Sequence, residues 1–251
     1  MIEQNEQLSA ELLEGRQAIN EAIKAGRPID KLYVLRGGEN LKKLLDDAKK
    51  VGAVIIERDK VALDAMSQTK MHQGVIASVA ARQYAELEDI ITSAKSAERP
   101  PLIVLCDGVD DGRNLGAICR TAEAVGAHGV VVTKRRSAGL SVWTDRAAAG
   151  ALEYLPLARV GNLTQAIKTL KDAGFWIYGA DGDGDTDGLT TNFSGAVALV
   201  MGSEESGLSR LVREQCDYIV SLPMRGKIGS LNVSAAAAVL LYRIMACNET
   251  E

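Results

Sequence analysis

The sequence lacks the features that direct a protein into or across a membrane. Residues 1–6 carry neither the basic leader nor the apolar stretch of a secretory signal. The longest weakly polar run, residues 233–241, is far shorter than the roughly 18 to 20 apolar residues that a membrane-spanning helix needs. We therefore expect a soluble cytoplasmic protein without a membrane partner.

Signatures of disulfide, metal and nucleotide-phosphate chemistry are missing as well. The four cysteines lie far apart, without a CxxC pair or a Cys/His cluster, so neither a disulfide framework nor a zinc site is predicted. Neither GxGxxG nor GxxxxGK followed by Ser or Thr occurs, which disfavours a dinucleotide or Walker-type site. Residues 183–188 fit the start of an EF-hand loop, but Ser194 stands where a bidentate Glu is required. We predict an acidic surface turn there and no metal site.

Basic charge is in deficit, and aromatic residues make up only 4% of the chain. The 29 Lys and Arg residues against 33 Asp and Glu residues give a formal net charge of -4, whereas binding to nucleic acid usually leaves a basic footprint. Net charge alone therefore argues against a nucleic-acid partner. The 47% of hydrophobic residues and the length of 251 residues are ordinary for globular cores, in one large domain or two smaller ones.

The first 80 residues alternate between helical and strand patterns. Residues 14–25 place small or apolar side chains at helical spacing. Strands are predicted at 31–35, 53–56 and 75–79, and a second helix at 41–51. These elements form a small α/β domain, residues 1–80. A polar stretch that ends in Pro100-Pro101 then indicates a linker over residues 81–99.

Residues 100–251 alternate strands and helices more regularly. Apolar strands are predicted at 102–106, 129–133, 175–180, 196–201 and 218–222. Helices are predicted at 116–125, 163–173 and 232–247. This alternation indicates a mostly parallel sheet covered on both faces, and ligands bind such sheets at the carboxyl ends of the strands. Three loops rich in Gly, Ser and Asn occupy those positions.

The first of these loops leads from the strand ending at Cys106 into a helix, over residues 107–122. Free backbone N–H groups at the start of that helix could meet an anion. Arg120 is an unusual charge between Ile118 and Ala122. Two interpretations of its guanidinium stay open: it caps a strand end through a carboxylate, or it binds a phosphate or a carboxylate of a ligand.

The other two loops also combine glycine with polar side chains. Residues 202–209 follow a predicted strand and carry adjacent carboxylates, which suit hydrogen bonding to a ligand or to an arginine. A helical turn capped by Ser206 or Ser209 would explain much of that segment without a ligand. Residues 221–234 supply hydroxyls and an amide where the last helix begins. Those groups suit both helix capping and the binding of a polar ligand.

Together the three loops carry recognisable motifs. They read Asn-Leu-Gly-Ala-Ile-Cys-Arg-Thr-Ala from residue 114, Gly-Ser-Glu-x-x-Gly-Leu-Ser from residue 202, and Pro-Met-x-Gly-x-x-x-Ser-Leu-Asn-Val-Ser-x-Ala from residue 223. In this order and at these separations, they resemble the three motifs of the SpoU/TrmH branch of the SPOUT RNA methyltransferases. Residues 14–18 and 72–77 also resemble the small ribosomal-protein-like substrate-binding domain of that family. The two-domain layout is most similar to members that modify a guanosine of 23S ribosomal RNA.

The resemblance implies a fold, a cofactor and a reaction. The fold would be an α/β domain whose C-terminal part forms a deep trefoil knot, normally a homodimer through that domain. The reaction would be methyl transfer to the ribose 2′-OH of a 23S rRNA guanosine. The cofactor would be S-adenosylmethionine, held near Gly202, Leu222, Met224 and Leu231.

The resemblance also implies roles for five site residues. Arg120 would accept the hydroxyl proton or stabilise a developing alkoxide, and the second role suits a guanidinium whose pKa lies above about 12. Asn114 would position that arginine or the ribose, and Glu204 would orient the arginine. Ser230 and Asn232 would complete the site.

Several cations fall near these motifs, which weakens the objection from net charge. Local potential rather than net charge steers a phosphate backbone. RNA-binding side chains are predicted at Arg16, Arg113, Arg225 and Lys227, while acidic residues gather elsewhere, notably over 181–187. The partner would be 23S rRNA or the assembling large ribosomal subunit. A tRNA substrate, and a non-catalytic RNA-binding assembly factor on the same scaffold, are the alternatives that stay open.

Overall fold

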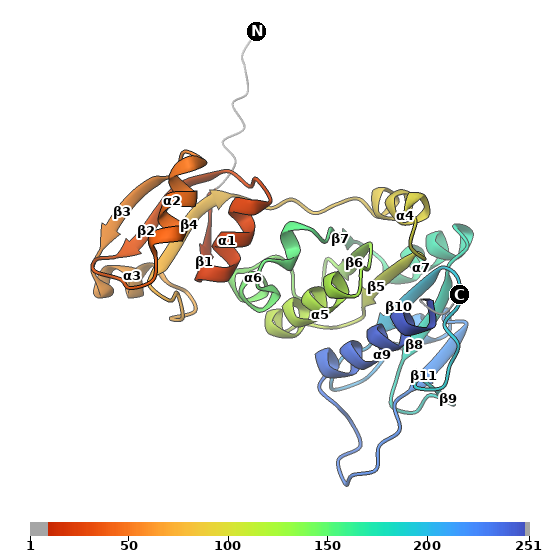
Figure 1. The fold of residues 1–251 in the computed structure, drawn as a ribbon. Helices are drawn as coiled ribbons and strands as arrows, with labels where there is room; N and C mark the ends of the chain where they lie inside the picture. The colour runs from red at the N-terminus through yellow and green to blue at the C-terminus, as the bar shows by residue number, and fades with distance from the viewer. Residues whose placement is uncertain (1–9, 249–251) are drawn as a thin grey trace. The chain divides into compact units, whose positions relative to one another are not determined.

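In the computed structural model, which describes residues 10–248, the chain divides into two compact units. The first unit ends at Gln83 and the second begins at Tyr84. Each unit has its own β-sheet and its own buried apolar core. Figure 1 shows the elements of both units in chain order.

The first unit, within residues 10–83, is a four-stranded mixed sheet with helices packed on it. Its elements are β1 (Ala10–Glu14), α1 (Arg16–Lys24), β2 (Ile29–Leu35), α2 (Lys42–Lys50), β3 (Val54–Arg58), α3 (Lys60–Met66) and β4 (Val75–Ala80). The strand order is β1-β4-β2-β3, in which β4 is antiparallel to β1 and to β2, and β2 is parallel to β3. Buried residues of α1 and α2 form the core with the sheet.

Strand β1 and helix α3 are absent from the sequence prediction, and the first helix begins two residues later than predicted. Glu14, predicted to start that helix, is the last residue of β1, and Gly15 separates the two elements with a φ of 96°. All five residues of β1 pair with β4. This long-range pairing overrides the local pattern, which had no strand signal in this segment.

A buried carboxylate fixes the loop between α3 and β4. Glu14 is 2% exposed, and its carboxylate accepts hydrogen bonds from Ser67 Oγ and Gln68 N, each at 2.7 Å, and from the Thr69 hydroxyl. Burial by itself raises the pKa of Glu14, but these donors outweigh it, and the net pKa is lowered. The ionised carboxylate therefore holds residues 67–69 against the end of β1.

The second unit is built on a seven-stranded sheet among residues 84–248. Its strands are β5 (Leu102–Cys106), β6 (Gly129–Thr133), β7 (Leu157–Val160), β8 (Trp176–Ala180), β9 (Thr186–Asp187), β10 (Val197–Met201) and β11 (Tyr218–Ser221). Its helices are α4 (Leu87–Ser96), α5 (Gly112–Ala124), α6 (Val142–Ala148), a 3-10 turn (Ala151–Glu153), α7 (Leu163–Asp172), α8 (Arg210–Arg213) and α9 (Val233–Asn248). The strand order is β7-β6-β5-β10-β8-β11-β9, and every neighbouring pair is parallel.

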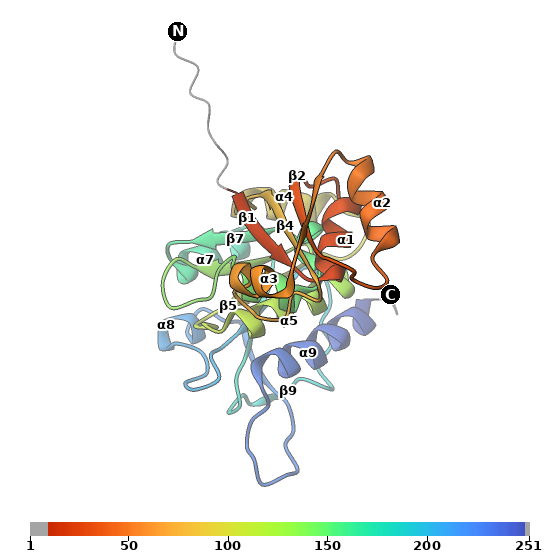
Figure 2. The same cartoon turned by 90° about the vertical axis from the view of Figure 1, so that its left-hand side faces the viewer.

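Helices cover both faces of this sheet, so the predicted parallel sheet between two helical layers is confirmed. Helices α5, α6 and α9 contribute to the core on one face, and α4, α7 and α8 to the core on the other. Figure 2 shows α9 running beside α5, against which it packs. Gly116 permits a close crossing of α5 and α6, because a Cβ there would lie 2.4 Å from the backbone oxygen of Thr144.

A linker is predicted over residues 81–99, but helix α4 occupies part of this segment. Its Leu87, Ile90 and Ala94 are buried in the core of the second unit. These residues have helical spacing, but the polar residues around them and the following proline pair obscured the pattern in the sequence. Helix α5 likewise begins at Gly112, earlier than predicted, because the Asp111 side chain caps it.

Candidate functional site

Four neighbouring strands end in one row at the carboxyl edge of the second sheet. Met201, the last residue of β10, pairs with Cys106 of β5 and with Ala180 of β8, and Ala180 pairs with Val220 of β11. The three motif loops and the turn that begins at Asp181 leave the sheet along this row. The strand order changes direction next to β5, which is where open parallel sheets form ligand crevices.

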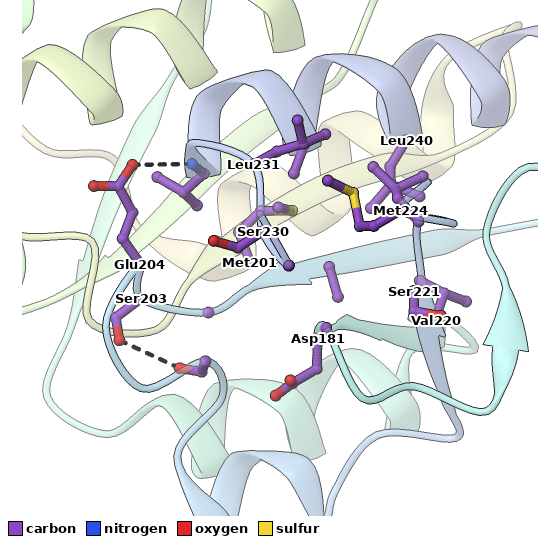
Figure 3. A pocket seen from close by; sticks show the side chains of 18 residues that line it. Asp181, Met201, Ser203, Glu204, Val220, Ser221, Met224, Ser230, Leu231 and Leu240 are labelled. Carbon is purple, nitrogen blue, oxygen red and sulfur yellow. Dashed lines mark hydrogen bonds between the residues drawn. The ribbon is translucent and has the colours of Figure 1, made fainter. Parts of the chain in front are cut away.

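A cavity of about 180 Å³ lies between the loop after β10, the loop after β11 and the turn that begins at Asp181 (Figure 3), and none of residues 107–122 lines it. All the residues predicted to hold the cofactor line it, namely Gly202, Leu222, Met224 and Leu231. Its polar wall includes Asp181, Ser203, Glu204 and Ser230. Among the described residues, the lining contains two carboxylates and no Lys or Arg side chain.

The loop after β10 is a closed turn. Ser203 and Gly207 exchange two backbone hydrogen bonds of 2.9 and 3.1 Å, and Ser203 Oγ lies 2.8 Å from Ser206 Oγ. A Cβ on Gly202 would lie 2.4 Å from the backbone carbon of Gly207, so this crossing requires glycine. The turn presents Glu204 toward the start of α9, as Figure 3 shows.

Helix α8 follows this turn, but a serine side chain does not cap it. Ser209 precedes the helix and makes no side-chain capping hydrogen bond. Its backbone N–H donates instead to Asp107 Oδ2 at 2.7 Å, and Asp107 N–H donates to the backbone oxygen of Met201 at 2.8 Å. Asp107 therefore joins the loop after β5 to the loop after β10.

Two amides and a carboxylate join all three motif loops. Asn232 Nδ2 donates to Asn114 Oδ1 at 2.9 Å and also to Glu204, and Val233 N–H donates to Glu204 Oε1 at 3.1 Å. Asn232 Oδ1 accepts from Ser234 N–H at 3.0 Å and so caps α9. Because the donors and the acceptor of the Asn232 amide are both engaged, the network fixes its orientation.

Arg120 lies outside this network. Its side chain is exposed on α5, and within residues 10–248 it makes neither an ion pair nor a hydrogen bond. Glu204, predicted to orient this arginine, binds Asn232 and Val233 instead. Helix geometry explains the separation, because Arg120 is about 9 Å farther along α5 than Asn114 and about 120° around its axis.

Three of the cations predicted to bind RNA, Arg113, Arg225 and Lys227, are exposed, and Arg16 is half-buried. Arg113 pairs with Asp111 at 2.6 Å, and its hydrogen bonds lower the pKa of that carboxyl. Arg225 and Lys227 lie in the exposed loop between β11 and α9. Arg16 lies in the first unit, where its Nε donates to a backbone oxygen at 3.1 Å.

The acidic turn after β8 departs from the sequence prediction. Residues 181–187 were expected to lie away from the site, but the Asp181 side chain lines the cavity and is only 16% exposed. The signal in the sequence was its place directly after the last residue of a predicted strand. Strand β8 ends beside β10 in the sheet, an arrangement that the order of elements along the chain does not reveal.

Other kinds of chemistry find little support in the part of the chain that the structure describes. No group of three His, Cys, Asp or Glu side chains in residues 10–248 could hold a metal ion. Burial raises the pKa of Cys106 to about 12, and it does the same for Cys216, so neither thiol is a ready nucleophile. No helix in this range is long and apolar enough to cross a membrane.

Comparison with known proteins connects this geometry to a family. The model of the SpoU rRNA methylase family matches residues 101–242, and the model for RNA 2′-O ribose methyltransferase substrate binding matches residues 12–85. The TrmH family tRNA/rRNA methyltransferase of Bacillus subtilis is 42% identical over 235 residues, which cover 92% of this chain and 93% of that protein.

Solved structures agree with this match. The SpoU methyltransferase AviRb from Streptomyces viridochromogenes, in complex with the cofactor AdoMet, has a TM-score of 0.79 at 28% identity, over 94% of this chain and 89% of that one. An AdoMet-bound rRNA methyltransferase from Sinorhizobium meliloti has a TM-score of 0.78 at 25% identity, over 94% and 87% of the two chains. The chain therefore belongs to the SpoU rRNA methylase family and is an RNA methyltransferase of the SpoU/TrmH type, as the three motifs predict.

Proposed function

We propose that this protein transfers the methyl group of S-adenosylmethionine to the ribose 2′-OH of a guanosine in 23S rRNA, either free or in the assembling large subunit. The observation that carries the proposal is the cavity at the carboxyl edge, where the three motif loops meet. The first unit, which matches a substrate-binding family for RNA, supports a large folded RNA as the substrate. Relatives named as rRNA or tRNA/rRNA methyltransferases align over both units.

The cavity residues fit the cofactor. Leu222, Met224 and Leu231 offer an apolar slot for an adenine ring, and Gly202 brings the end of β10 into the same lining. The two carboxylates of the lining suit a positively charged ligand. When bound, S-adenosylmethionine supplies a methyl group on a sulfonium. AviRb holds the same cofactor on a similar fold.

Methyl transfer requires the hydroxyl to lie in line with the methyl group and to lose its proton. We propose that Asn114, Asn232 and Ser230 position the ribose at the mouth of the cavity. Glu204 keeps the Asn232 amide in place through the contacts described above. Arg120 then stabilises the developing oxyanion or accepts the proton, and the electrostatic role is favoured because a guanidinium keeps its charge in proteins.

Among residues 10–248, Arg120 makes no hydrogen bond or ion pair with a site residue of its own chain, so we propose that a homodimer brings it to the cavity of the partner. Helix α9 supports such an interface, because its Val239 and Tyr242 are 40% and 50% exposed and α9 packs against α5. In a two-fold dimer the two copies would exchange Arg120 residues symmetrically. We also propose the trefoil knot; the hydrogen bond from Val233 to Glu204, which holds the start of α9 against the loop after β10, supports it.

Two inactive variants test this sharing of the site. Arg120→Ala and Asn232→Ala homodimers should each lose methyl transfer by about 100-fold. A co-refolded equimolar mixture should recover about a quarter of the wild-type rate, because half of its dimers carry one complete site. Recovery should be measured with labelled cofactor. If the mixture were as inactive as the two variants alone, Arg120 would not act in the site of the partner chain, and the shared site would be refuted.

The exposed cations should set the salt dependence of RNA binding. We propose that Arg113, Arg225 and Lys227 contact phosphates near the cavity, and that Arg16 does so on the first unit. Each such contact releases counterions, so removing one should reduce the slope of log affinity against log salt by about one.

The substrate is identified by incubating the protein with labelled S-adenosylmethionine and either unmodified 23S rRNA or bulk tRNA, and by mapping the methylated positions. We expect label on a guanosine of 23S rRNA. Label in tRNA alone would overturn the rRNA substrate and support the tRNA alternative, since the name of the Bacillus subtilis relative includes both kinds of RNA. No label in either RNA, despite cofactor binding, would favour a non-catalytic assembly factor.

A further inference from the structure

Asp181 is a carboxylate in the wall of the cavity, on an element that none of the three motifs includes. It directly follows the last residue of β8, whose end lies between those of β10 and β11 in the sheet. Its side chain is 16% exposed and lines the cavity, and Figure 3 shows it running from the end of β8 toward the loop after β10. A ligand of the cavity therefore lies next to this residue and within reach of the electric field of its carboxylate.

The position of the Asp181 carboxylate is fixed on two sides. Its Oδ2 accepts a hydrogen bond from Leu208 N–H at 3.1 Å and pairs with Arg213 at 3.2 Å. The loop after β10 passes so close that a Cβ on Gly207 would lie 2.7 Å from Oδ2. The side chain cannot swing out of the wall without breaking these contacts.

Arg213 does not neutralise this part of the wall. The arginine also pairs with Asp183 at 2.7 Å, and its hydrogen bond lowers the pKa of that carboxyl, which stays ionised. Two carboxylates therefore share one guanidinium, and the cluster of Asp181, Asp183 and Arg213 carries a net formal charge of one negative unit. Glu204 adds a second carboxylate, while among the described residues the lining offers no cation.

We propose that Asp181 is a specificity-determining residue that makes the cavity prefer the charged sulfonium cofactor over the neutral product of the reaction. The inference rests on the proposed function, in which the cavity holds S-adenosylmethionine. On transfer, a bond from the ribose oxygen to the methyl carbon forms and the carbon–sulfur bond breaks. Its electron pair returns to sulfur, and the hydroxyl proton leaves to solvent.

The cofactor thus loses its sulfonium charge in the same step that makes the methylated RNA. A fixed negative wall attracts the cofactor before that step and no longer attracts the thioether after it. The wall therefore favours loading of the cofactor and release of S-adenosylhomocysteine. Asp181 would affect ligand binding through its charge, so its role can be distinguished experimentally from a packing role.

Calorimetric binding of three ligands to the full-length protein tests the proposal. The ligands are S-adenosylmethionine, S-adenosylhomocysteine, and sinefungin, which carries an amine in place of the sulfonium. Asp181→Asn should raise the Kd of both cationic ligands about fivefold and that of the neutral thioether less than twofold. Asp185→Asn is the matched control, because Asp185 lies in the same turn but does not line the cavity; it should change none of the three.

A second variant keeps the test decisive if Asp181→Asn fails to fold. Arg213→Gln removes the cation and leaves the Asp181 carboxylate in place. The proposal expects it to bind S-adenosylmethionine more tightly relative to S-adenosylhomocysteine, whereas a purely structural ion pair predicts equal weakening of both. Equal changes for all three ligands in Asp181→Asn, or none, would overturn the role of Asp181. Failure of the wild-type protein to bind any of them would instead refute the proposed cofactor site.

Discussion

Each unit of the molecule uses a glutamate to hold a distant segment of the chain, but the two glutamates differ in their surroundings. Glu14 of the first unit is 2% exposed and binds three donors in a buried loop. Glu204 of the second unit is exposed at the cavity and binds the start of α9. Burial makes the first contact costly to lose, whereas exposure leaves the second open to a ligand. We therefore expect the first to govern stability and the second to govern activity.

The largest effect should follow the loss of the buried carboxylate. Glu14→Ala should lower the free energy of unfolding by about 3 kcal/mol, because it leaves buried donors without an acceptor. Urea denaturation measures this change. Glu57→Ala is a matched control on the same unit: Glu57 is 64% exposed in a long ion pair, and its loss should cost less than about 0.5 kcal/mol. Equal costs for the two variants would contradict the comparison.

For the exposed Glu204 we expect the opposite result, a large effect on activity and a small effect on stability. Glu204→Gln should reduce kcat about 30-fold, equivalent to about 2 kcal/mol, because the Asn232 amide loses its charged acceptor. Its unfolding free energy should change by less than about 1 kcal/mol. Glu205→Gln serves as control, since Glu205 is exposed in the same loop and does not line the cavity. If Glu204→Gln lowered the free energy of unfolding strongly and left kcat unchanged, Glu204 would act on stability as Glu14 does, and the comparison would be wrong.

The smallest effect should be a dependence of stability on pH. The pKa of Glu14 lies below its ordinary value of 4.5 in the folded protein, so the folded state binds the proton less readily than the unfolded state. This contribution is complete above pH 4.5 and is lost as the pH falls through the lower folded pKa. Urea denaturation at a series of acidic pH values should show the loss in the wild type. In Glu14→Ala this loss of unfolding free energy at acidic pH should be absent. If the unfolding free energy of the variant fell with pH as steeply as that of the wild type, Glu14 would not be its source.

Much of the second unit could be predicted from sequence, because buried parallel strands are continuous apolar runs. The strands at Leu102–Cys106 and Gly129–Thr133 have the predicted bounds. Strand β1 could not be found in this way, since its only signal is its pairing with β4. Helix α4 had the signal, but its polar neighbours concealed it.

Only the site residues that lie within the three motifs could be predicted from the sequence. The four residues predicted to bind the cofactor line one cavity, because their loops leave β10 and β11 at the same edge of the sheet, on either side of β8. The hydrogen bonds of Glu204 could not be predicted, since they depend on where α9 begins, and the separation of Arg120 from Glu204 depends on the rotation of α5. Asp181 could not be assigned to the site from the sequence, because β8 becomes a neighbour of β10 only in the folded sheet.

The strand order also bears on the synthesis of the chain. Strands β5, β6 and β7 are consecutive and adjacent, so they can pair as soon as they leave the ribosome. Strand β8 pairs with β10 and β11, both of which are made after it, and β10 separates it from β5. The half of the sheet that carries the cavity must therefore wait for residue 201 or later, which makes its assembly a late and slow event. The cavity of the proposed site therefore cannot be complete before Leu240, the last residue that lines it, has been synthesised.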